Sequence, residues 1–397
     1  MKIAFSTSVI QRGRTGVAQY VFALVRSLIR QSRGHEIHLL VLEEDLPLFA
    51  FARDHVTLVA VSEKWRSPLK NVFWHQFILP LWLKREGIDV LHVPSYRRMV
   101  WSAPCATVAT IHDLAPFHVK GKYDLARMLY GRVVVKYLAR RQDAIVAVSE
   151  NTSADITRFF GIPRERQRVI LNGLDHDRFC PEAAPGKSTG EKSFFLYVSR
   201  LEHPAKNHVR LIEAFERFKA ATGSDWQLVL AGSDWHGAEH IHAAVQRSPY
   251  REEIRLPGFV ADADLPDLYR RVGAFVYPSL FEGFGMPPVE AMACGCPVIS
   301  SDAGSLAEVV GDAALIIDPL SVASIGTALG RVALDEKTRD HLVLVGFANA
   351  RRFDWGENAG NLLRVYERAV HGPPVGGIER RGEGSDAIRV TTPHAHV

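Results

Sequence analysis

One stretch of this sequence joins two apolar runs through a glycine-rich turn and a short helical pattern. The runs are Gly273–Tyr277 and Pro297–Ser300, and each predicts a buried strand. Gly283-Phe-Gly285 predicts the turn, and the residues after it predict a helix. Strands joined through a helix in this way lie parallel in one sheet that helices cover. The stretch therefore restricts its part of the chain to an α/β fold.

The same alternation of strand and helix patterns extends over most of the chain. A chain of 397 residues is too long for a single core, and the pattern is interrupted by a polar, proline- and glycine-rich segment at 181–190. Helical patterns such as Tyr123–Arg141 separate the predicted strands. These strands are Lys2–Ser6, Ile37–Leu42, Val56–Val61, Asp89–Val93, Ala106–Ile111, Ala144–Val148, Phe194–Val198, Trp226–Ala231, Ile254–Pro257, Ala274–Pro278, Pro297–Ser300 and Ala314–Ile317.

The pattern predicts two Rossmann-like domains with parallel sheets. We place an N-terminal domain at 1–178, a linker at 179–193 and a C-terminal domain at 194–355. A helix follows at 356–371. The tail, 372–397, contains glycine, proline and charge with few apolar residues, and it is predicted to be disordered.

Two glutamates lie on either side of the glycine turn, eight positions apart. Free backbone N–H groups and the helix dipole attract an anion to such a turn. Glu290, one to two turns into the helix, can accept hydrogen bonds from the two hydroxyls of a ribose, and Glu282 lies near the group attached to the phosphate. A phosphate with a sugar on each side is a nucleotide sugar. The alternative is an ordinary crossover whose glutamates face solvent.

The segment Tyr277–Glu308 resembles the signature of retaining GT-B glycosyltransferases of family 4, the group 1 glycosyltransferases. Their hallmark is a glutamate, seven residues and a second glutamate. The resemblance covers roughly residues 1–370. It implies a GT-B architecture, in which two Rossmann-like domains face a central cleft, with the acceptor on the first domain and the nucleotide-sugar donor on the second. It also implies that the helix at 356–371 returns to the first domain.

Four residues are predicted to be catalytic. Arg200 and Lys206 follow the first strand of the second domain, where fixed cations can stabilise a leaving diphosphate, although either alone could be an ordinary surface cation. Glu282 is predicted to hold the donor sugar. His112 ends a strand of the first domain, and the resemblance implies that it contacts the donor sugar. The alternative is a histidine that caps the strand end, with Asp113 orienting the loop.

Further residues are predicted to bind the donor. Gly16 lies in the first loop between a strand and a helix, where a plain helix start is the alternative. Phe259 and Val260 follow a strand of the second domain and can lie against the base, unless Phe259 only packs in the core. The backbone of the turn and the second glutamate complete the set: Gly283, Phe284, Gly285, Met286 and Glu290.

No cofactor or metal is predicted. Two Asp-x-Asp spacings, Asp175–Asp177 and Asp262–Asp264, resemble a metal-binding motif of the other major glycosyltransferase fold, but they lie in a connection and before a helix, where Asp262 is a plausible cap. The four cysteines lack zinc spacing and fit a reducing cytoplasm. No signal peptide or membrane-spanning segment is evident.

The basic charge is concentrated in the first half of the chain. Residues 1–180 contain 26 lysines and arginines against 16 aspartates and glutamates, whereas the rest contains 22 against 28. Within 64–85, aromatic and basic residues alternate, as in segments that settle at membrane interfaces. We expect this protein, which the cysteines place in the cytoplasm, to bind peripherally to the inner face of the cytoplasmic membrane, and we expect no nucleic-acid partner. For the charge asymmetry itself, a solvated basic surface is the alternative. A helix that packs on the sheet is the alternative for this segment.

These observations predict a metal-independent retaining hexosyltransferase that acts on a saccharide or a polyprenyl-diphosphate-linked acceptor in surface polysaccharide or glycolipid synthesis. The runs His112–Pro116 and Glu202–His208 resemble those of bacterial mannosyltransferases, which implies GDP-mannose as the donor. The alternatives are a UDP-sugar donor, a sugar-nucleotide epimerase and a nucleotide-sugar-binding subunit without catalysis.

Overall fold

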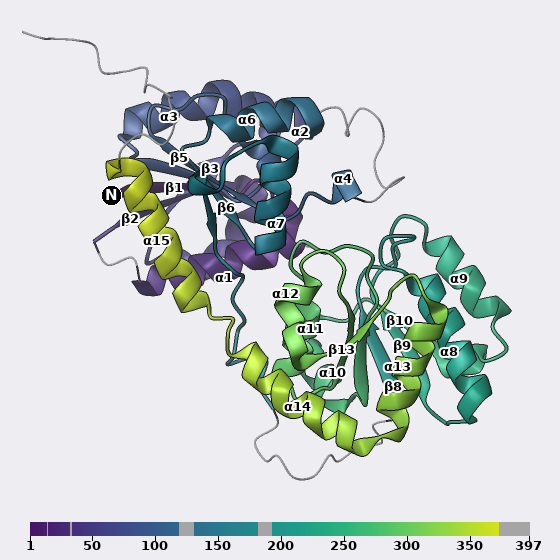
Figure 1. The fold of residues 1–397 in the computed structure, drawn as a ribbon. Coiled ribbons are helices and arrows are strands. Elements are labelled where there is room, and N and C mark those ends of the chain that lie inside the picture. The colour runs from purple at the N-terminus through teal and green to yellow at the C-terminus, as the bar shows by residue number, and fades with distance from the viewer. Residues whose placement is uncertain (14, 32–33, 119–130, 182–192, 373–397) are drawn as a thin grey trace, which may run out of the picture.

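The computed structural model describes residues 1–397 except 14, 32–33, 119–130, 182–192 and 373–397, and it forms two α/β domains, each around its own sheet (Figure 1). The first sheet has the strand order β3-β2-β1-β4-β5-β6-β7 and the second has the order β10-β9-β8-β11-β12-β13. Every strand pair is parallel. Both orders reverse direction beside the first strand of the domain, as in doubly wound folds.

The strands of the first sheet are β1 Lys2–Ser6, β2 Glu36–Leu42, β3 Thr57–Val61, β4 Val90–Val93, β5 Ala106–Ile111, β6 Ala144–Ala147 and β7 Gln167–Val169. Those of the second are β8 Phe194–Val198, β9 Gln227–Ala231, β10 Ile254–Gly258, β11 Ala274–Tyr277, β12 Val298–Ser301 and β13 Leu315–Ile317. All the predicted strands are present. The sequence reading missed β7, because three residues with only one apolar side chain carry no periodic signal.

Helices cover both sheets. They are α1 Gly16–Gln31, α2 Pro68–Phe73, α3 Leu79–Glu86, α4 Ala115–His118, α6 Lys136–Arg141, α7 Glu150–Asp155, α8 His208–Thr222, α9 Ala238–Arg247, α10 Leu265–Arg271, α11 Met286–Ala293, α12 Leu306–Val310, α13 Val322–Leu334, α14 Glu336–Ala350 and α15 Trp355–His371. Short π-helical turns join α2 to α3 (Trp74–Ile78) and precede α6 (Gly131–Val135). The helix predicted at Tyr123–Arg141 lies partly outside the described residues, as do most of the predicted linker and tail.

The last helix packs on the first domain although the chain reaches it from the second (Figure 1). Tyr366 of α15 is buried among the core residues of the first sheet, and its hydroxyl lies 2.5 Å from Nδ1 of the buried His92. Ser27 of α1 donates a hydrogen bond to the carbonyl oxygen of Trp355. The segment that leaves the first domain near Leu174 and the segment that returns to it after Phe353 are joined by a hydrogen bond from the Leu174 amide to the Phe353 carbonyl oxygen. Two chain crossings therefore lie side by side between the domains.

No helix in the part of the chain that the structure describes is long and apolar enough to span a membrane.

Candidate active site

The site is built on the turn between β11 and α11, where two glycines are sterically required. Gly285 has a φ of +91°, and a Cβ there would lie 2.4 Å from Leu306 Cδ2. A Cβ on Gly283 would lie 1.9 Å from the carbonyl oxygen of His112, a residue of the first domain. Pro287 and Pro288 lie in the first turn of α11, directly after Met286, and have no N–H group. The amide donors at this helix start are therefore confined to residues 283–286.

The Glu282 carboxylate receives three hydrogen bonds on one oxygen. Lys206 Nζ lies 2.5 Å from Oε1, the Ser279 hydroxyl 2.5 Å and the Tyr277 hydroxyl 3.0 Å. Because β8 and β11 are neighbours, their loops run side by side, and the Leu280 amide donates to the Ala205 carbonyl. The other carboxylate oxygen, Oε2, is not part of this hydrogen-bonded group and can accept a further donor.

The neighbours of Glu282 keep it ionised. Burial favours the neutral form, but the positive charge of Lys206 and the three hydrogen bonds outweigh it, so the pKa of Glu282 is lowered from its ordinary value. The side chains of Lys206 and Glu282 are each only 15% exposed. The site therefore holds a preformed, largely buried ion pair.

Glu290 lies in a different environment. Burial raises its pKa to about 7, and the hydrogen bond that Tyr269 donates to Oε2 at 3.0 Å and the charge of Arg178 oppose this rise only in part. Arg178 comes from the segment that crosses between the domains, and its guanidinium donates to the carbonyl of Asp262. The structure thus places Glu290 against Tyr269, and Glu282 against Lys206.

Arg200 is not part of the Lys206–Glu282 pair. Its side chain is 48% exposed, lies 3.3 Å from a carboxylate oxygen of Glu202, and stacks over the ring of Trp235. Both Arg200 and Lys206 belong to the loop between β8 and α8, as predicted. Only Lys206 contacts one of the two glutamates in the described structure.

The His112 ring is anchored within the first domain. Its Nε2 lies 3.0 Å from the Pro94 carbonyl oxygen, and the ring packs edge-on against Tyr20. Burial lowers the pKa of His112 from the ordinary value. A neutral ring that donates through Nε2 has Nδ1 as an acceptor. Asp113 accepts a hydrogen bond from the Ala115 amide and so orients the loop. It is the main-chain oxygen of His112, not its ring, that lies against Gly283.

The other predicted donor-binding residues differ in exposure. Phe259 is 71% exposed, which excludes the alternative that it packs in the core, whereas Val260 is partly buried against that core. The Phe284 side chain is buried against Phe353, so only its backbone is available to a ligand. Gly16 is the first residue of α1, with Thr15 Oγ1 accepting from the Ala18 amide. A Cβ on Gly16 would meet nothing within 4 Å.

Two family models together match most of the chain. "Glycosyltransferase Family 4" matches residues 14–178 and "Glycosyl transferases group 1" matches residues 182–344. The chain belongs to the group 1 glycosyltransferases of family 4. It is therefore a glycosyltransferase, as the Glu-x7-Glu signature predicted.

Individual relatives of this glycosyltransferase agree with that assignment. O-antigen chain mannosyltransferase B of Escherichia coli is 28% identical over 392 residues, which covers 92% of this chain and all of the relative. The serotype-specific mannosyltransferase WbdA of Escherichia coli is 29% identical over 68% of this chain, which spans only 34% of WbdA. The crystal structure of HepE from Anabaena in complex with UDP and glucose superposes with a TM-score of 0.72 over 92% of this chain and 99% of HepE, at 19% identity. The predicted GT-B fold is confirmed.

Several residues of this glycosyltransferase that hold the turn against the first domain were missed by sequence reasoning. The hydroxyls of Ser149 and Thr152 lie 3.0 and 3.3 Å from the Gly283 carbonyl oxygen. The Glu308 carboxylate of the second domain accepts from the amides of Glu150 and Asn151 of the first. A serine before a helix signals a cap, but nothing in the sequence indicates that this helix start faces the other domain.

The two Asp-x-Asp segments have other partners. Asp175 Oδ1 accepts from the Arg178 amide, and Asp262 Oδ2 accepts from Gln19 of the first domain at 2.9 Å. The prediction that Asp262 caps the following helix is wrong, because its side chain is held across the domains by Gln19. No group of three potential metal ligands occurs among the described residues of this glycosyltransferase. Its metal independence stays a prediction.

The segment 64–85 divides into two faces. Trp74, Leu79 and Leu83 are buried against the first sheet, and Trp65 and Trp82 pack beside them. The exposed side chains that form the opposite face are Leu69, Phe73, Phe77 and Leu81, together with Trp101 and Tyr137 from neighbouring segments. We call these six residues the aromatic face. The alternative that this segment packs on the sheet thus holds for one of its two sides. Leu69 and Leu81 were not among the residues that the sequence had indicated for the other side.

Proposed function

We propose that this glycosyltransferase transfers a mannosyl unit from GDP-mannose to a saccharide or a polyprenyl-diphosphate-linked saccharide, with retention of anomeric configuration and without a metal ion. The observation that carries the chemistry is the buried Lys206–Glu282 ion pair beside the glycine turn. The full-length match to a protein named O-antigen chain mannosyltransferase B supports the sugar and the role in surface polysaccharide synthesis.

Lys206 would stabilise the leaving diphosphate. Negative charge grows on the phosphate oxygen as its bond to the anomeric carbon breaks, and a cation that is already held in place stabilises this charge without reorganisation. The Glu282 carboxylate and the Tyr277 ring, 5.9 Å from Nζ, hold the ammonium group. Arg200, from the same loop, would bind the more exposed phosphate, and Glu290 the ribose.

The hydrogen bonds on Glu282 favour a same-face displacement. A carboxylate oxygen that accepts three hydrogen bonds is a poor nucleophile, whereas Oε2 can accept a hydroxyl of the donor sugar. In this scheme the acceptor oxygen attacks the anomeric carbon from the side of the leaving group. A leaving phosphate oxygen takes the acceptor proton, and the nucleoside diphosphate departs. The His112 carbonyl oxygen, which lies against Gly283, would stabilise the positive charge at the anomeric carbon.

The aromatic face would bring the enzyme to a lipid-linked acceptor. Leu69 is 86% exposed, and Phe73, Phe77 and Leu81 follow it at intervals of four along the same helical segment. The Trp101 amide donates to Gln76, which joins Trp101 to this surface. Exposed Lys70 and Lys84 lie nearby in the sequence and can attract anionic head groups.

The reaction is tested with radiolabelled GDP-mannose and, separately, UDP-glucose, each with and without a bacterial lipid extract and with and without EDTA. The proposal predicts acceptor-dependent transfer from GDP-mannose that EDTA does not abolish, and an NMR spectrum of the product that shows retention. Transfer from UDP-glucose alone would support the alternative donor. Conversion of the donor without an acceptor would indicate an epimerase, and binding without release of nucleotide would indicate a non-catalytic subunit.

Membrane binding is tested separately by sedimentation with anionic vesicles at low salt. We expect Phe73→Ser/Phe77→Ser to abolish co-sedimentation while transfer to a water-soluble acceptor continues. A wild-type protein that does not bind these vesicles would refute this part of the proposal.

A further inference from the structure

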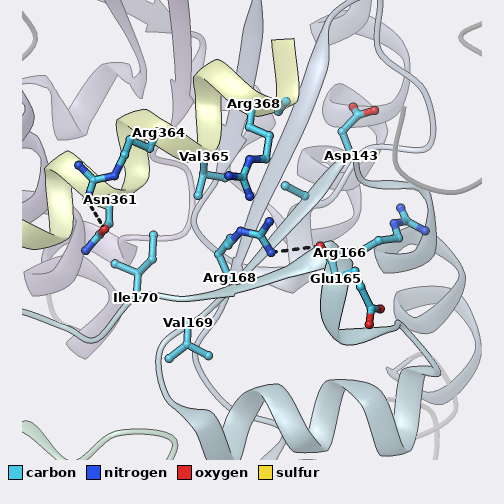
Figure 2. A pocket seen from close by; sticks show the side chains of 12 residues that line it. Asp143, Glu165, Arg166, Arg168, Val169, Ile170, Asn361, Arg364, Val365 and Arg368 are labelled. Atoms are coloured by element: carbon cyan, nitrogen blue, oxygen red, sulfur yellow. Dashed lines mark hydrogen bonds between the residues drawn. The ribbon is translucent and has the colours of Figure 1, made fainter. Parts of the chain in front are cut away.

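A cavity of about 180 Å³ lies at the outer edge of the first sheet, between β7 and α15 (Figure 2). β7 is the last strand of that sheet. None of the residues that line the cavity belongs to the proposed donor or acceptor machinery. Such a cavity is far larger than a single water molecule requires.

Four arginines line this cavity, which we call the arginine cavity. Arg166 and Arg168 come from the β7 segment, and Arg364 and Arg368 lie one turn apart on α15. Figure 2 shows the side chains of Arg168 and Arg368 reaching toward each other, whereas Arg364 is bound to Asn361 at 2.5 Å. Two independent elements therefore contribute positive charge to the same space.

The arginines are only partly neutralised by their surroundings. No salt bridge of the described residues includes any of the four. Two carboxylates lie in the wall. Asp143 accepts from the amide and hydroxyl of Thr107, and its charge opposes the lowering of the Arg166 pKa by burial, whereas Glu165 is exposed. The wall as a whole carries an excess of two positive charges.

The arrangement leaves hydrogen-bonding capacity unused. Arg166 Nε is buried and has no hydrogen-bond partner among the described residues. Burial and then the positive charges of Arg368 and Arg164 lower the pKa of Arg168. Gathering like charges around a cavity and burying an unpartnered N–H both destabilise a fold. An anion in the cavity would relieve both effects.

We infer that the arginine cavity binds a phosphoryl group, either a phosphate monoester or a diphosphate. The planar guanidinium group offers paired N–H donors that match phosphate oxygens. A phosphate monoester with up to two negative charges balances the excess charge of the wall. Bound there, it bridges β7 to α15, the helix by which the chain returns from the second domain to the first.

The test measures phosphate and pyrophosphate binding by isothermal titration calorimetry at constant ionic strength. The full-length protein is compared with Arg168→Gln/Arg368→Gln. Arg247→Gln, on the exposed end of α9, is the matched control, and Lys206→Ala reports binding at the donor site. We expect binding by the wild type, Arg247→Gln and Lys206→Ala, and binding about 10- to 100-fold weaker in the double variant.

A second arm separates a free phosphate from a lipid head group. The same proteins are sedimented with phosphatidylcholine vesicles with and without phosphatidic acid, which presents a phosphate monoester. Binding that depends on phosphatidic acid and on Arg168 and Arg368 identifies the lipid source, and binding only in solution identifies a free phosphorylated ligand. The inference is overturned if the double variant matches the wild type in both arms.

Thermal unfolding distinguishes a ligand site from a structural role of the arginines. Without added anion, the double variant should unfold at the same temperature as the wild type or higher, because like charges have been removed. A double variant that is less stable, together with a wild type that binds neither phosphate nor vesicles, would show that the arginines only support the fold.

Discussion

Glu282 and Glu290 are separated by seven residues, yet their surroundings shift their pKa values in opposite directions. Glu282 faces Lys206 and two hydroxyls, and its pKa is lowered. Glu290 accepts a hydrogen bond from the Tyr269 hydroxyl, and burial raises its pKa to about 7. The first carboxylate is thus ionised throughout the neutral range, and the second titrates within it.

The difference shows that two carboxylates of one motif can have different partners and different pKa values. A permanently ionised Glu282 can hold Lys206 and a sugar hydroxyl at any physiological pH. In the proposed mechanism, Glu290 accepts two hydroxyl hydrogen bonds well only when it is ionised, so its contribution to donor binding should depend on pH. Neighbouring side chains therefore assign the two roles.

The largest effect is expected from breaking the ion pair. Lys206→Ala and Glu282→Ala should each lower kcat by about 10²–10³, because a preorganised charge next to the leaving group is lost. The double variant should be little worse than either single variant, since the two residues act as a unit. Steady-state release of nucleotide measures this. Glu213→Ala, on the exposed face of α8, is the control, and additive losses would contradict the pairing.

A smaller loss is expected from Gly283→Ala. The added Cβ would lie 1.9 Å from the His112 carbonyl oxygen, so the turn must move away from the first domain. We expect about 10²-fold lower kcat/KM, the usual result of a displacement of about 1 Å in an active site. The matched control is Gly330→Ala in α13, where a Cβ meets only Phe218 at 3.8 Å. Unchanged kinetics would show that the contact with the first domain is not needed.

The pH dependence should distinguish the two glutamates. As the pH falls below about 7, Glu290 becomes protonated and the KM for the donor should rise by about tenfold, whereas Glu290→Gln should show a high KM that no longer varies with pH. Because folding raises this pKa, the ionised form destabilises the fold, and stability is lost as the pH rises through about 7. Glu290→Gln should therefore unfold at a higher temperature than the wild type at pH 8, with a smaller difference at pH 5. Equal melting curves at pH 8 would contradict the raised pKa.

The smallest effect is expected at the contact between the domains. Glu308→Gln weakens the acceptor for the amides of Glu150 and Asn151. The loss of one exposed charge-assisted contact is worth about 1 kcal/mol, which predicts a several-fold rise in the donor KM with little change in kcat. Small-angle scattering should show a larger mean radius of gyration. An unchanged KM and radius would mean that the contact does not hold the domains together.

Much of the fold was readable from local patterns. Apolar runs bounded by turns predicted the strands other than β7, because strands buried on both faces of a parallel sheet need nearly continuous apolar sequence. The spacing of Glu282 and Glu290 around Gly283 and Gly285 indicated the turn on which the candidate site is built. These signals lie within short segments, so no tertiary contact was needed to recognise them.

The sequence by itself determined two parallel α/β domains and the family, and it predicted which residues form the candidate site. The tertiary structure decided which of those residues meet: Lys206 with Glu282, Arg200 with Glu202, and the backbone of His112 with Gly283. It alone brought β7 and α15 together to form the arginine cavity. The physical reason is that pKa values and hydrogen bonds depend on neighbours that are distant along the chain, and only packing determines which neighbours those are.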